Sequence, residues 1–575
     1  MKETFPEPGM DLFVRRIDEN AKWQPHHTLV RFPDGLDWET DGYRSLTWQQ
    51  YADAINKTAY WLDETFGRCI NNETVAYYGP SDIRYAILFA ASVKTGRKLL
   101  VPDGRLMNDG LGQLLRSVEC VTWLYSAGGA FSPESELEAS GVRLQQFPSL
   151  EWCLAAGGTK QYPYEKTYEE AKNDEILIIH TGGTTGAPKP IVMNNGFWSA
   201  GCSFAGLARR HWPRGLSSDT FYGRSVILAI PMRFLAGHVL INMYAVFYNT
   251  SVVVPPADEI GLPPGMFKKL LRLNKVDGLV AFPFTIVDLY NNEECQNALR
   301  SLDSVTYLGA ALDRTVGDGL CMHTRLSSVI GATESGGRFS LDPIDRRLWY
   351  TFQFIPEHHV RMEKVENSGA LMGNEQSSDV YLSFIDRPPG GNPSIYQCAF
   401  WNYRMFTDID SIDTKELWKP VLDSDGSTRW EFIGRSDDWT KLIWMAKFNA
   451  QDIETRVSRY PGVKHVMVGG MGQAAPFILI EGNEDLLSKE GEGILDEIYE
   501  KVILAINKDS VEEVEIPRET MIIAKVGKPI KLTAKQLVSR REVETDYREE
   551  IEAAYERLRA ANKSMANERF LKYTR

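Results

Sequence analysis

A segment rich in glycine and threonine near residue 180 carries side chains suited to holding phosphate groups. A short apolar run, Glu175–Ile179, predicts a buried strand, and residues 180–191 continue as His-Thr-Gly-Gly-Thr-Thr-Gly-Ala-Pro-Lys-Pro-Ile. Glycines let backbone N–H groups turn toward a polyanion without Cβ clashes, and hydroxyl groups with one cation complete such a cradle. The GxxxxGK[ST] spacing of a Walker loop is absent. The segment therefore predicts a phosphate-binding loop of another type, the alternative being an ordinary surface turn.

The segments around this loop predict an α/β fold. Residues 47–66 have helical apolar spacing after a possible cap at Ser45 or Thr47. Strand-like runs occur at Val226–Pro231, Ser251–Pro255, Gly278–Phe282, Val305–Leu308 and Ser327–Ile330. Helical segments lie between several of these runs, and this alternation predicts largely parallel sheets. Residues 1–45 show no clear period and predict a wrapping N-terminal arm.

The composition changes near residue 434, which predicts a domain boundary. A chain of 575 residues is too long for a single core. We expect a core domain of stacked, mostly parallel sheets with helices at residues 1–434, and a smaller α+β lid at residues 435–575. The segments predicted for the lid are strands at Val463–Val468 and Phe477–Glu481 and helices at Gly493–Asn507 and Arg541–Asn562.

The overall composition favours a soluble enzyme. Hydrophobic residues make up 43% of the chain and charged residues 25%. The net charge of −13 argues against a nucleic-acid partner. The seven cysteines form no CxxC pair, which fits reduced cytosol. The chain has no run of about 18 apolar residues, so no membrane span is predicted. Without an apolar signal core after Met1, we expect a cytoplasmic protein.

The Gly/Thr segment resembles the phosphate-binding signature of adenylate-forming enzymes, which include acyl-CoA synthetases, luciferases and the adenylation domains of peptide synthetases. Their pattern is Thr-Ser-Gly-Thr/Ser-Thr-Gly-x-Pro-Lys, and Gly182 replaces the serine here. The resemblance implies that ATP phosphates are held by Thr181, Gly183, Thr184, Thr185, Gly186 and Lys189.

Other motifs of this family follow in order. The segment Ile330–Gly337, IGATESGG, resembles the family's Tyr-Gly-x-Thr-Glu motif. The match implies that Thr333 binds the α-phosphate and that Glu334 holds Mg²⁺, which prefers oxygen ligands. The segment YLGAAL resembles the adenine-binding strand end, with Gly309 and Ala310 against the ring.

The resemblance also implies a ribose site and a hinge. The segment RMFTDID stands where the family has Thr-Gly-Asp, so Asp408 is the expected ligand of the ribose hydroxyls. Asp410 is a close rival. The segment FIGRSDD matches Gly-Arg-x-Asp-Asp, which implies a role for Arg435 at the ribose or phosphates and for Asp437 at the hinge of a mobile lid.

The C-terminal segment TAKQLVSR is similar to the Thr-x-Lys-Gly-Thr-Val-x-Arg ending of fungal NRPS-like enzymes, with Gln536 in place of the glycine. Lys535 is therefore the expected catalytic lysine, and Lys531 and Lys528 are the alternatives. Similarity to the adenylation portion of these adenylation–carrier–reductase proteins extends over residues 20–560. The chain would then be a stand-alone ligase or one domain of a longer protein.

The expected acid has no free α-amine. Relatives that activate α-amino acids have an aspartate in the segment that corresponds to IPMRFLAGHVLI, which holds no acidic residue. A buried ammonium without a partner is costly. Expected pocket residues are Phe204, Phe234, His238, Phe282, Phe284, Gly309, Gly331 and Ser335. They suit an aryl or other compact acid, or a quaternary ammonium acid, although His238 and the aromatic residues could equally be core.

Together these motifs predict an ATP- and Mg²⁺-dependent ligase that forms an acyl adenylate and transfers the acyl group to a thiol. The acceptor would be CoA or the phosphopantetheine of a carrier domain, in cis or in trans. Two alternatives remain, an amide-forming ligase and a nucleotide-binding relative without catalytic activity. The fold alone does not decide between them.

Overall fold

The computed structural model divides into two compact units. Unit 1 comprises residues 1–359, 386–412 and 423–425, and unit 2 comprises residues 360–385, 413–422 and 426–575. The predicted boundary between residues 434 and 435 falls inside unit 2, and the mobile lid stays a prediction. The residues that the structure describes are 11–35, 37–102, 109–126, 137, 141–155, 157–182, 188–211, 214–256, 261–365, 379–391, 393–436, 439–442, 447–487, 491–509, 514–533 and 536–564.

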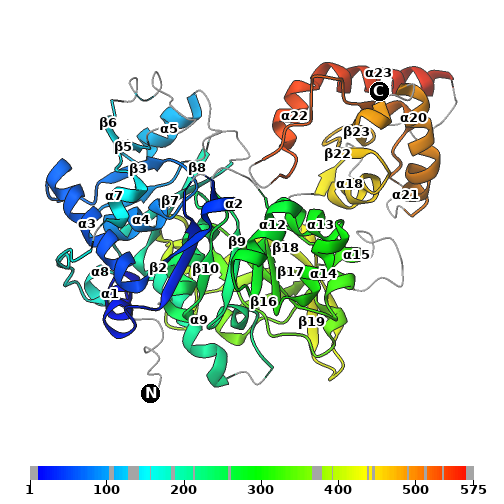
Figure 1. Ribbon diagram of the computed structural model, residues 1–575. Helices are drawn as coiled ribbons and strands as arrows, with labels where there is room; N and C mark the ends of the chain where they lie inside the picture. Colours follow the sequence, from blue (N-terminus) through cyan, green and yellow to red (C-terminus); the bar gives the residue numbers. More distant parts are fainter. Residues whose placement is uncertain are drawn as a thin grey trace. The chain divides into compact units, whose positions relative to one another are not determined.

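The larger sheet of unit 1 has eight strands (Figure 1). In spatial order they are β14 (Gly336–Arg338), β13 (Arg325–Ala332), β12 (Ser304–Leu308), β11 (Gly278–Ala281), β9 (Ser225–Ala229), β10 (Ser251–Val253), β1 (Thr28–Pro33) and β2 (Tyr43–Thr47). Pairing is parallel from β13 to β1 and antiparallel at both ends. The carboxyl ends of β9, β11, β12 and β13 therefore meet at one edge, where open α/β sheets bind ligands.

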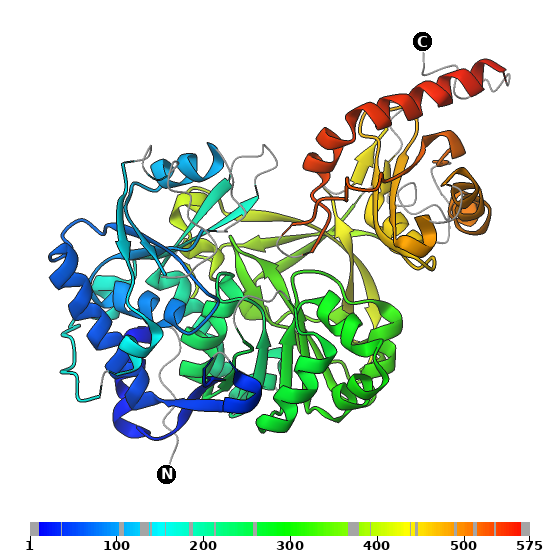
Figure 2. The same ribbon diagram turned by 45° about the horizontal axis from the view of Figure 1, so that its top comes forward.

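A group of helices packs on this sheet through an apolar cluster. They are α12 (Pro264–Leu273), α13 (Pro283–Tyr290), α14 (Glu293–Ser301) and α15 (Arg314–Leu320). Figure 2 shows them gathered beside the strands. Leu279 and Val305 of the sheet belong to the same buried cluster as Phe267 and Leu289 of the helices. Burial of this apolar surface is the main stabilising contribution here.

The second sheet of unit 1 has six strands and carries the Gly/Thr segment. In order they are β6 (Arg143–Gln146), β5 (Cys120–Tyr125), β3 (Thr74–Tyr78), β4 (Lys98–Leu100), β7 (Glu175–Gly182) and β8 (Pro188–Asn194). All neighbours are parallel except β7 and β8. The main helices near it are α1 (Phe13–Trp23), α3 (Trp48–Phe66), α4 (Arg84–Lys94), α5 (Asp109–Ser117) and α9 (Asn195–His211).

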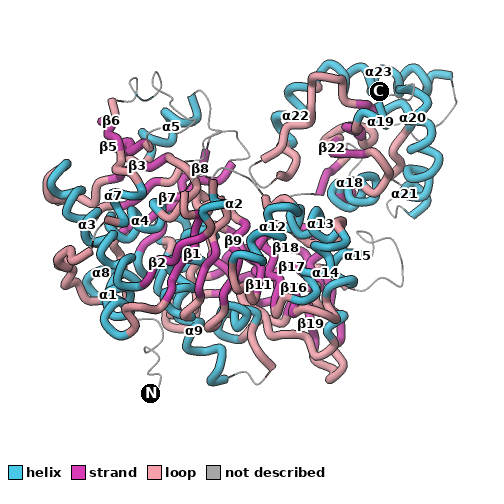
Figure 3. The backbone as a smooth tube through the Cα atoms, in the orientation of Figure 1, coloured by secondary structure: helices cyan, strands magenta, loops and turns pink. Residues whose placement is uncertain are grey.

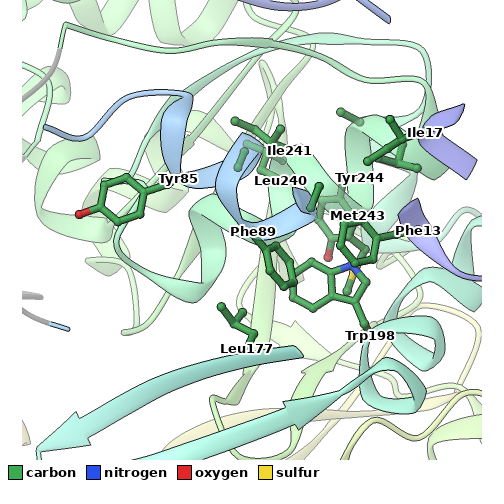
Figure 4. Close-up of a cluster of buried hydrophobic side chains, with 14 of the residues drawn as sticks. Phe13, Ile17, Tyr85, Phe89, Leu177, Trp198, Leu240, Ile241, Met243 and Tyr244 are labelled. Atoms are coloured by element: carbon green, nitrogen blue, oxygen red, sulfur yellow. The ribbon is translucent and has the colours of Figure 1, made fainter. Parts of the chain in front are cut away.

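Aromatic side chains from three helices meet in the main core (Figure 4). The ring centroid of Phe89 on α4 lies 5.0 Å from that of Phe13 on α1 and 5.0 Å from that of Trp198 on α9. All three side chains are buried. This packing fixes α1 against the six-stranded sheet, and β1 and β2 belong to the eight-stranded sheet, so the predicted wrapping arm is wrong over the described residues 11–35 and 37–45. The apolar residues Phe13, Ile17 and Ala21 have helical spacing and face this core.

Unit 2 contains nearly all residues of four neighbouring strands of one sheet, together with a separate three-stranded sheet. The four are β16 (Val360–Lys364), β17 (Tyr381–Asp386), β18 (Ser411–Leu422) and β19 (Thr428–Arg435). The three-stranded sheet consists of β22 (Val463–Gly469), β23 (Phe477–Gly482) and β24 (Met521–Ile523). Two short strands, β20 (Trp439–Lys441) and β21 (Lys447–Asn449), form a hairpin.

The helices of unit 2 surround the three-stranded sheet (Figure 3). In the described ranges they are α18 (Ala450–Ser458), α19 (Glu484–Leu487), α20 (Gly491–Ile498), α21 (Leu504–Asp509), α22 (Arg540–Asp546) and α23 (Arg548–Ser564). The helix predicted at residues 541–562 is broken into α22 and α23 at Tyr547. The Tyr547 side chain is fully buried, and its hydroxyl donates to the carbonyl of Lys528.

Candidate functional site

Three of the predicted pocket aromatics lie together at the carboxyl ends of β9 and β11. Phe234 follows β9 as the residue before α10 (Leu235–Val239), and its N–H donates to Pro231 O at 3.1 Å. The Phe234 and Phe282 rings meet edge to face with centroids 5.7 Å apart, and Phe282 stacks on Phe284 at 5.9 Å. Parallel pairing of β9 with β11 explains why residues far apart in sequence become neighbours.

The next two strands end in small and polar residues. Gly309, directly after β12, has a φ of 88°, a conformation that favours glycine. Ala310 follows it and is partly buried. The main chain at this strand end therefore presents little side-chain bulk, as the resemblance to an adenine-binding segment requires.

Thr333 and Glu334 occupy the tip of a tight turn between β13 and β14. Ser335 N donates to Ala332 O at 3.2 Å, which closes the turn. Gly331 pairs with Gly337 across the hairpin, and a Cβ on Gly331 would lie 2.2 Å from Gly336 O. Only glycine fits there, so the hairpin holds Thr333 and Glu334 at the strand edge in a fixed backbone conformation.

A buried asparagine links this turn to the segment that bears Asp408. Asn402 is 1% exposed, and its Nδ2 donates to Glu334 O at 3.2 Å. Its own carbonyl accepts N–H bonds from Met405 and Phe406 of the short helix α17 (Tyr403–Phe406). Asp408 lies two residues after the end of α17.

Arg387 holds the backbone on both sides of Asp408. Its guanidinium donates to the carbonyls of Phe406 at 2.8 Å, Thr407 at 3.2 Å, Ile409 at 3.2 Å and Gly391 at 3.3 Å. Its backbone N–H donates to Asp410 O at 2.7 Å, and its guanidinium lies 4.3 Å from the centre of the Phe400 ring. Arg387 was not among the predicted site residues, because no spacing pattern marks an arginine that binds carbonyl oxygens.

The carboxylates of Asp408 and Asp410 remain exposed and form no ion pair within the described part of the chain. Both are thus available to hydroxyl donors, and the geometry does not separate them. Asp408 as the ribose ligand stays a prediction.

The Gly/Thr segment forms the β7–β8 hairpin. Thr181 pairs with Lys189, and Gly182 pairs with Pro188. Lys189 is exposed on β8. Gly183, Thr184, Thr185 and Gly186 lie outside the described residues, as do the side chains of Thr181 and Phe204. The hairpin brings Lys189 to the base of the predicted phosphate loop.

Several predicted residues belong to unit 2 or are not described. Arg435 ends β19, where it pairs with Glu416 in the strand register. Lys535 and Asp437 lie outside the described residues. The alternative lysines form ion pairs within unit 2, Lys531 with Asp546 at 3.0 Å and Lys528 with Glu550 at 2.8 Å. The roles of Thr184, Glu334, Asp408 and Arg435 at a shared ATP site therefore remain predictions.

His238 lies in the main core. Its ring is fully buried, edge-on to Tyr85 at 6.1 Å and Phe89 at 5.4 Å between centroids. Neither ring nitrogen has a hydrogen-bond partner among the described residues. Burial lowers the pKa of His238 to about 3, so the ring is neutral. This placement favours the core alternative over a role in the substrate pocket.

The residues present fit a magnesium ion held mainly by substrate. No group of three His, Cys, Asp or Glu side chains gathers as a metal site in the described ranges. Protein-bound Mg²⁺ commonly takes one or two carboxylates and completes its shell with phosphate oxygens and water. Glu334 is partly buried, and its carboxylate has no ion pair among the described residues. It is thus free to serve as such a ligand.

Comparison with known proteins identifies the class. The profile of the AMP-binding enzyme family matches residues 17–372, and that of the AMP-binding enzyme C-terminal domain matches residues 437–559. The chain therefore belongs to the AMP-binding enzymes, and it is an enzyme of the adenylate-forming type. The predicted membership of this superfamily is confirmed.

Individual relatives refine this assignment. The chain is 27% identical over 561 residues to a carboxylic acid reductase of Neurospora crassa, covering 96% of this chain and 51% of that protein. It is 27% identical over 567 residues to the isocyanide synthase-NRPS hybrid crmA of Aspergillus fumigatus, covering 95% and 34%. It thus spans about half or less of the curated relatives' length. The predicted likeness to fungal NRPS-like enzymes is confirmed.

Solved structures share the fold. The amide bond synthetase McbA from Marinactinospora thermotolerans superposes with a TM-score of 0.65 at 16% identity, covering 93% of this chain and 98% of that one. The anthranilate CoA ligase AuaEII gives a TM-score of 0.65 at 15% identity, covering 94% and 97%. These matches confirm the predicted α/β fold class. None of the helices in the described ranges is both long and apolar enough to cross a membrane.

Proposed function

We propose that the protein activates a carboxylic acid without a free α-amine as its acyl adenylate and then transfers the acyl group to a thiol. The observation that supports this most directly is the shared strand edge of unit 1. There the ends of β9 and β11 carry the aromatic cluster of Phe234 and Phe282, and the end of β13 carries Thr333 and Glu334. An apolar binding surface beside a phosphate-binding turn suits an acid that reacts with ATP.

In the first step a carboxylate oxygen of the acid attacks the α-phosphorus of ATP. The bond from that phosphorus to the bridging oxygen breaks, and pyrophosphate leaves with its electron pair. The Thr333 hydroxyl would donate a hydrogen bond to the α-phosphate, and the Asp408 carboxylate would accept hydrogen bonds from the ribose hydroxyls. Glu334 would hold Mg²⁺, whose charge offsets the negative charge of the phosphate oxygens.

In the second step the sulfur of the acceptor attacks the acyl carbon, AMP leaves, and the thiol proton passes to solvent. The acceptor is CoA or the phosphopantetheine of a carrier domain, in cis or in trans. Lys535 would stabilise the reacting carboxylate and α-phosphate in the first step. The lid and the Asp437 hinge would serve the change between the two steps.

The proposed acid class depends on the segment after β9. Leu235 follows Phe234, and the helix α10 contains no carboxylate. Without an acidic partner, burial of an α-ammonium group would be costly.

Exchange of labelled pyrophosphate into ATP, measured with a panel of carboxylic acids, tests the first step. We expect Mg²⁺-dependent exchange with acids that lack an α-amine, and a loss of about 100-fold or more in the Glu334→Gln variant. CoA, a phosphopantetheinylated carrier protein and an amine, each added separately, then identify the acceptor. ATP binding without exchange for any acid would contradict the proposal.

A further inference from the structure

Arg233 is a partly buried cation of unit 1 that has no counter-ion among the described residues. Three buried cations elsewhere in this unit do have carboxylate partners: Lys94 with Asp18 at 2.7 Å, Arg97 with Asp63 at 2.9 Å and Arg84 with Asp82 at 2.6 Å. The guanidinium of Arg233 forms no ion pair or hydrogen bond with the described residues, and it lies 5.5 Å from the centre of the Phe234 ring. A charge withdrawn from water without a counter-ion destabilises the fold unless a ligand supplies one.

The backbone around Arg233 is held in place. The N–H of Met232 donates to Ser81 Oγ at 2.8 Å, which ties the end of β9 to the loop after β3. The N–H of Phe234 donates to Pro231 O at 3.1 Å. A Cβ on Gly237 would lie 2.8 Å from Met232 Cα, so the start of α10 packs directly on this turn. The position of Arg233 at the strand edge is therefore a fixed feature of the fold.

The groups around the guanidinium do not neutralise it. Asp82 is held by Arg84, whose guanidinium donates to both carboxylate oxygens. The Tyr85 hydroxyl is engaged with the backbone of Gly79. Burial raises the pKa of Tyr85 by more than the positive charge of Arg233 lowers it, so the phenol stays protonated and carries no negative charge.

We infer that Arg233 binds a second anionic group on the acid substrate, which makes the substrate a dicarboxylic acid or an acid of equivalent charge. This inference rests on the proposed function. Arg233 directly precedes Phe234, which contacts Phe282, so the cation flanks the aromatic cluster proposed to bind the acid. A guanidinium matches a carboxylate with two parallel N–H donors. The reacting carboxylate would lie near Thr333 and the second one near Arg233.

Pyrophosphate exchange with matched pairs of acids tests this inference without any thiol acceptor. Suitable pairs are benzoate with terephthalate or isophthalate, and hexanoate with adipate. We expect the wild type to favour one diacid over its monoacid by about tenfold or more in kcat/KM, and Arg233→Met to remove this preference. Arg233→Lys, which keeps the charge but not the fork, should retain part of it. Arg143→Met is the matched control, because Arg143 also lies over a phenylalanine ring, that of Phe66, on the outer strand β6.

Each outcome has a distinct meaning. Exchange with monoacids at equal rates in the wild type and Arg233→Met, with no preferred diacid, would overturn this inference and leave the proposed function intact. An effect of Arg233→Met only on the KM of CoA or carrier protein would overturn it in favour of a contact with the acceptor's phosphate. Absence of exchange with every acid would instead reject the proposed function. A circular dichroism spectrum and melting temperature equal to those of the wild type ensure that the variants are folded.

Discussion

Replacing Arg387 by alanine should weaken ATP binding indirectly, because Arg387 positions Asp408 and is not itself a proposed ATP ligand. In the structure this side chain binds the carbonyls of Phe406, Thr407 and Ile409, the residues immediately around Asp408. Asp408 itself receives no support from another side chain in the described part of the chain. If Asp408 is the ribose ligand, Arg387 is the residue that positions it.

The size of the effect follows from the bonds that are lost. A hydrogen bond to a charged donor contributes about 1.5–3 kcal/mol when buried, and these bonds are partly exposed, so we count about 1 kcal/mol for each of the three. If the loop around Asp408 loses about 3 kcal/mol of stabilisation, the fraction of molecules in which this loop has its binding-competent conformation falls by the corresponding factor. Since about 1.4 kcal/mol corresponds to a factor of ten, KM for ATP should rise about 100-fold.

The assay is pyrophosphate exchange with ATP, 2′-deoxy-ATP and 3′-deoxy-ATP. The wild type should discriminate against each deoxy analogue, because each lacks a ribose hydroxyl that would donate a hydrogen bond to the Asp408 carboxylate. In Arg387→Ala this discrimination should fall toward unity, whereas KM for the acid should change little. Arg346→Ala is the matched control: its guanidinium also donates to a backbone carbonyl, that of Thr324 at 2.6 Å, but at the amino end of β13, away from the site.

Two results would refute this reasoning. One is a folded Arg387→Ala enzyme with KM for ATP and nucleotide discrimination within about twofold of wild type. The other is an equal rise in KM for ATP and for the acid, since a general loss of order in unit 1 would affect both substrates. Arg387→Lys, which can reach fewer carbonyls, should lie between the two extremes.

Two further predictions concern the stability of unit 1. Asp18→Asn leaves the buried Lys94 ammonium without its carboxylate and should lower the free energy of unfolding, measured by urea denaturation, by about 3 kcal/mol. The double variant Asp18→Asn with Lys94→Met should recover most of this stability. An equal loss in the single and the double variant would contradict the role of the ion pair. For His238, whose folded pKa of about 3 lies below the value of 6.5 for a free histidine, the unfolded state takes up the proton first, so its contribution to stability is full above pH 6.5 and is lost as pH falls toward 3. His238→Phe should reduce the acid-induced fall in melting temperature over that range, and an unchanged pH profile would show that this histidine is not buried as described.

The sequence predicted those parts of the fold that depend on local pattern. The helix at residues 48–66 begins where Thr47 caps it, because Thr47 Oγ1 accepts from Gln50 N and Gln50 Oε1 accepts from Thr47 N, a capping box visible in the sequence. The five strands predicted between residues 226 and 330 also lie within two residues of their predicted bounds, since apolar runs of this length are typical of buried parallel strands.

The parts that were missed depend on contacts between distant segments. Nothing in the sequence shows that Arg387 would bind carbonyls about 20 residues later, or that Arg233 would lack a counter-ion, because both properties arise from where the other charges lie in the fold. The core position of His238 was equally hidden, since a histidine one turn into a helix after a pocket residue could face either side.

The short helix α17 connects the two sheets of unit 1 at the proposed ATP site. At its amino end Asn402 binds Glu334 O in the β13–β14 turn of the eight-stranded sheet. Arg404 of the same helix pairs with Glu175 at the start of β7, with a guanidinium–carboxylate contact of 2.8 Å, and Lys98 pairs with this carboxylate as well. These contacts relate Asp408 both to the turn that bears the proposed magnesium ligand and to the strand that leads into the Gly/Thr loop. Because all of these contacts lie within unit 1, we expect this unit alone to set the spacing between the proposed ribose ligand, Asp408, and the proposed metal ligand, Glu334.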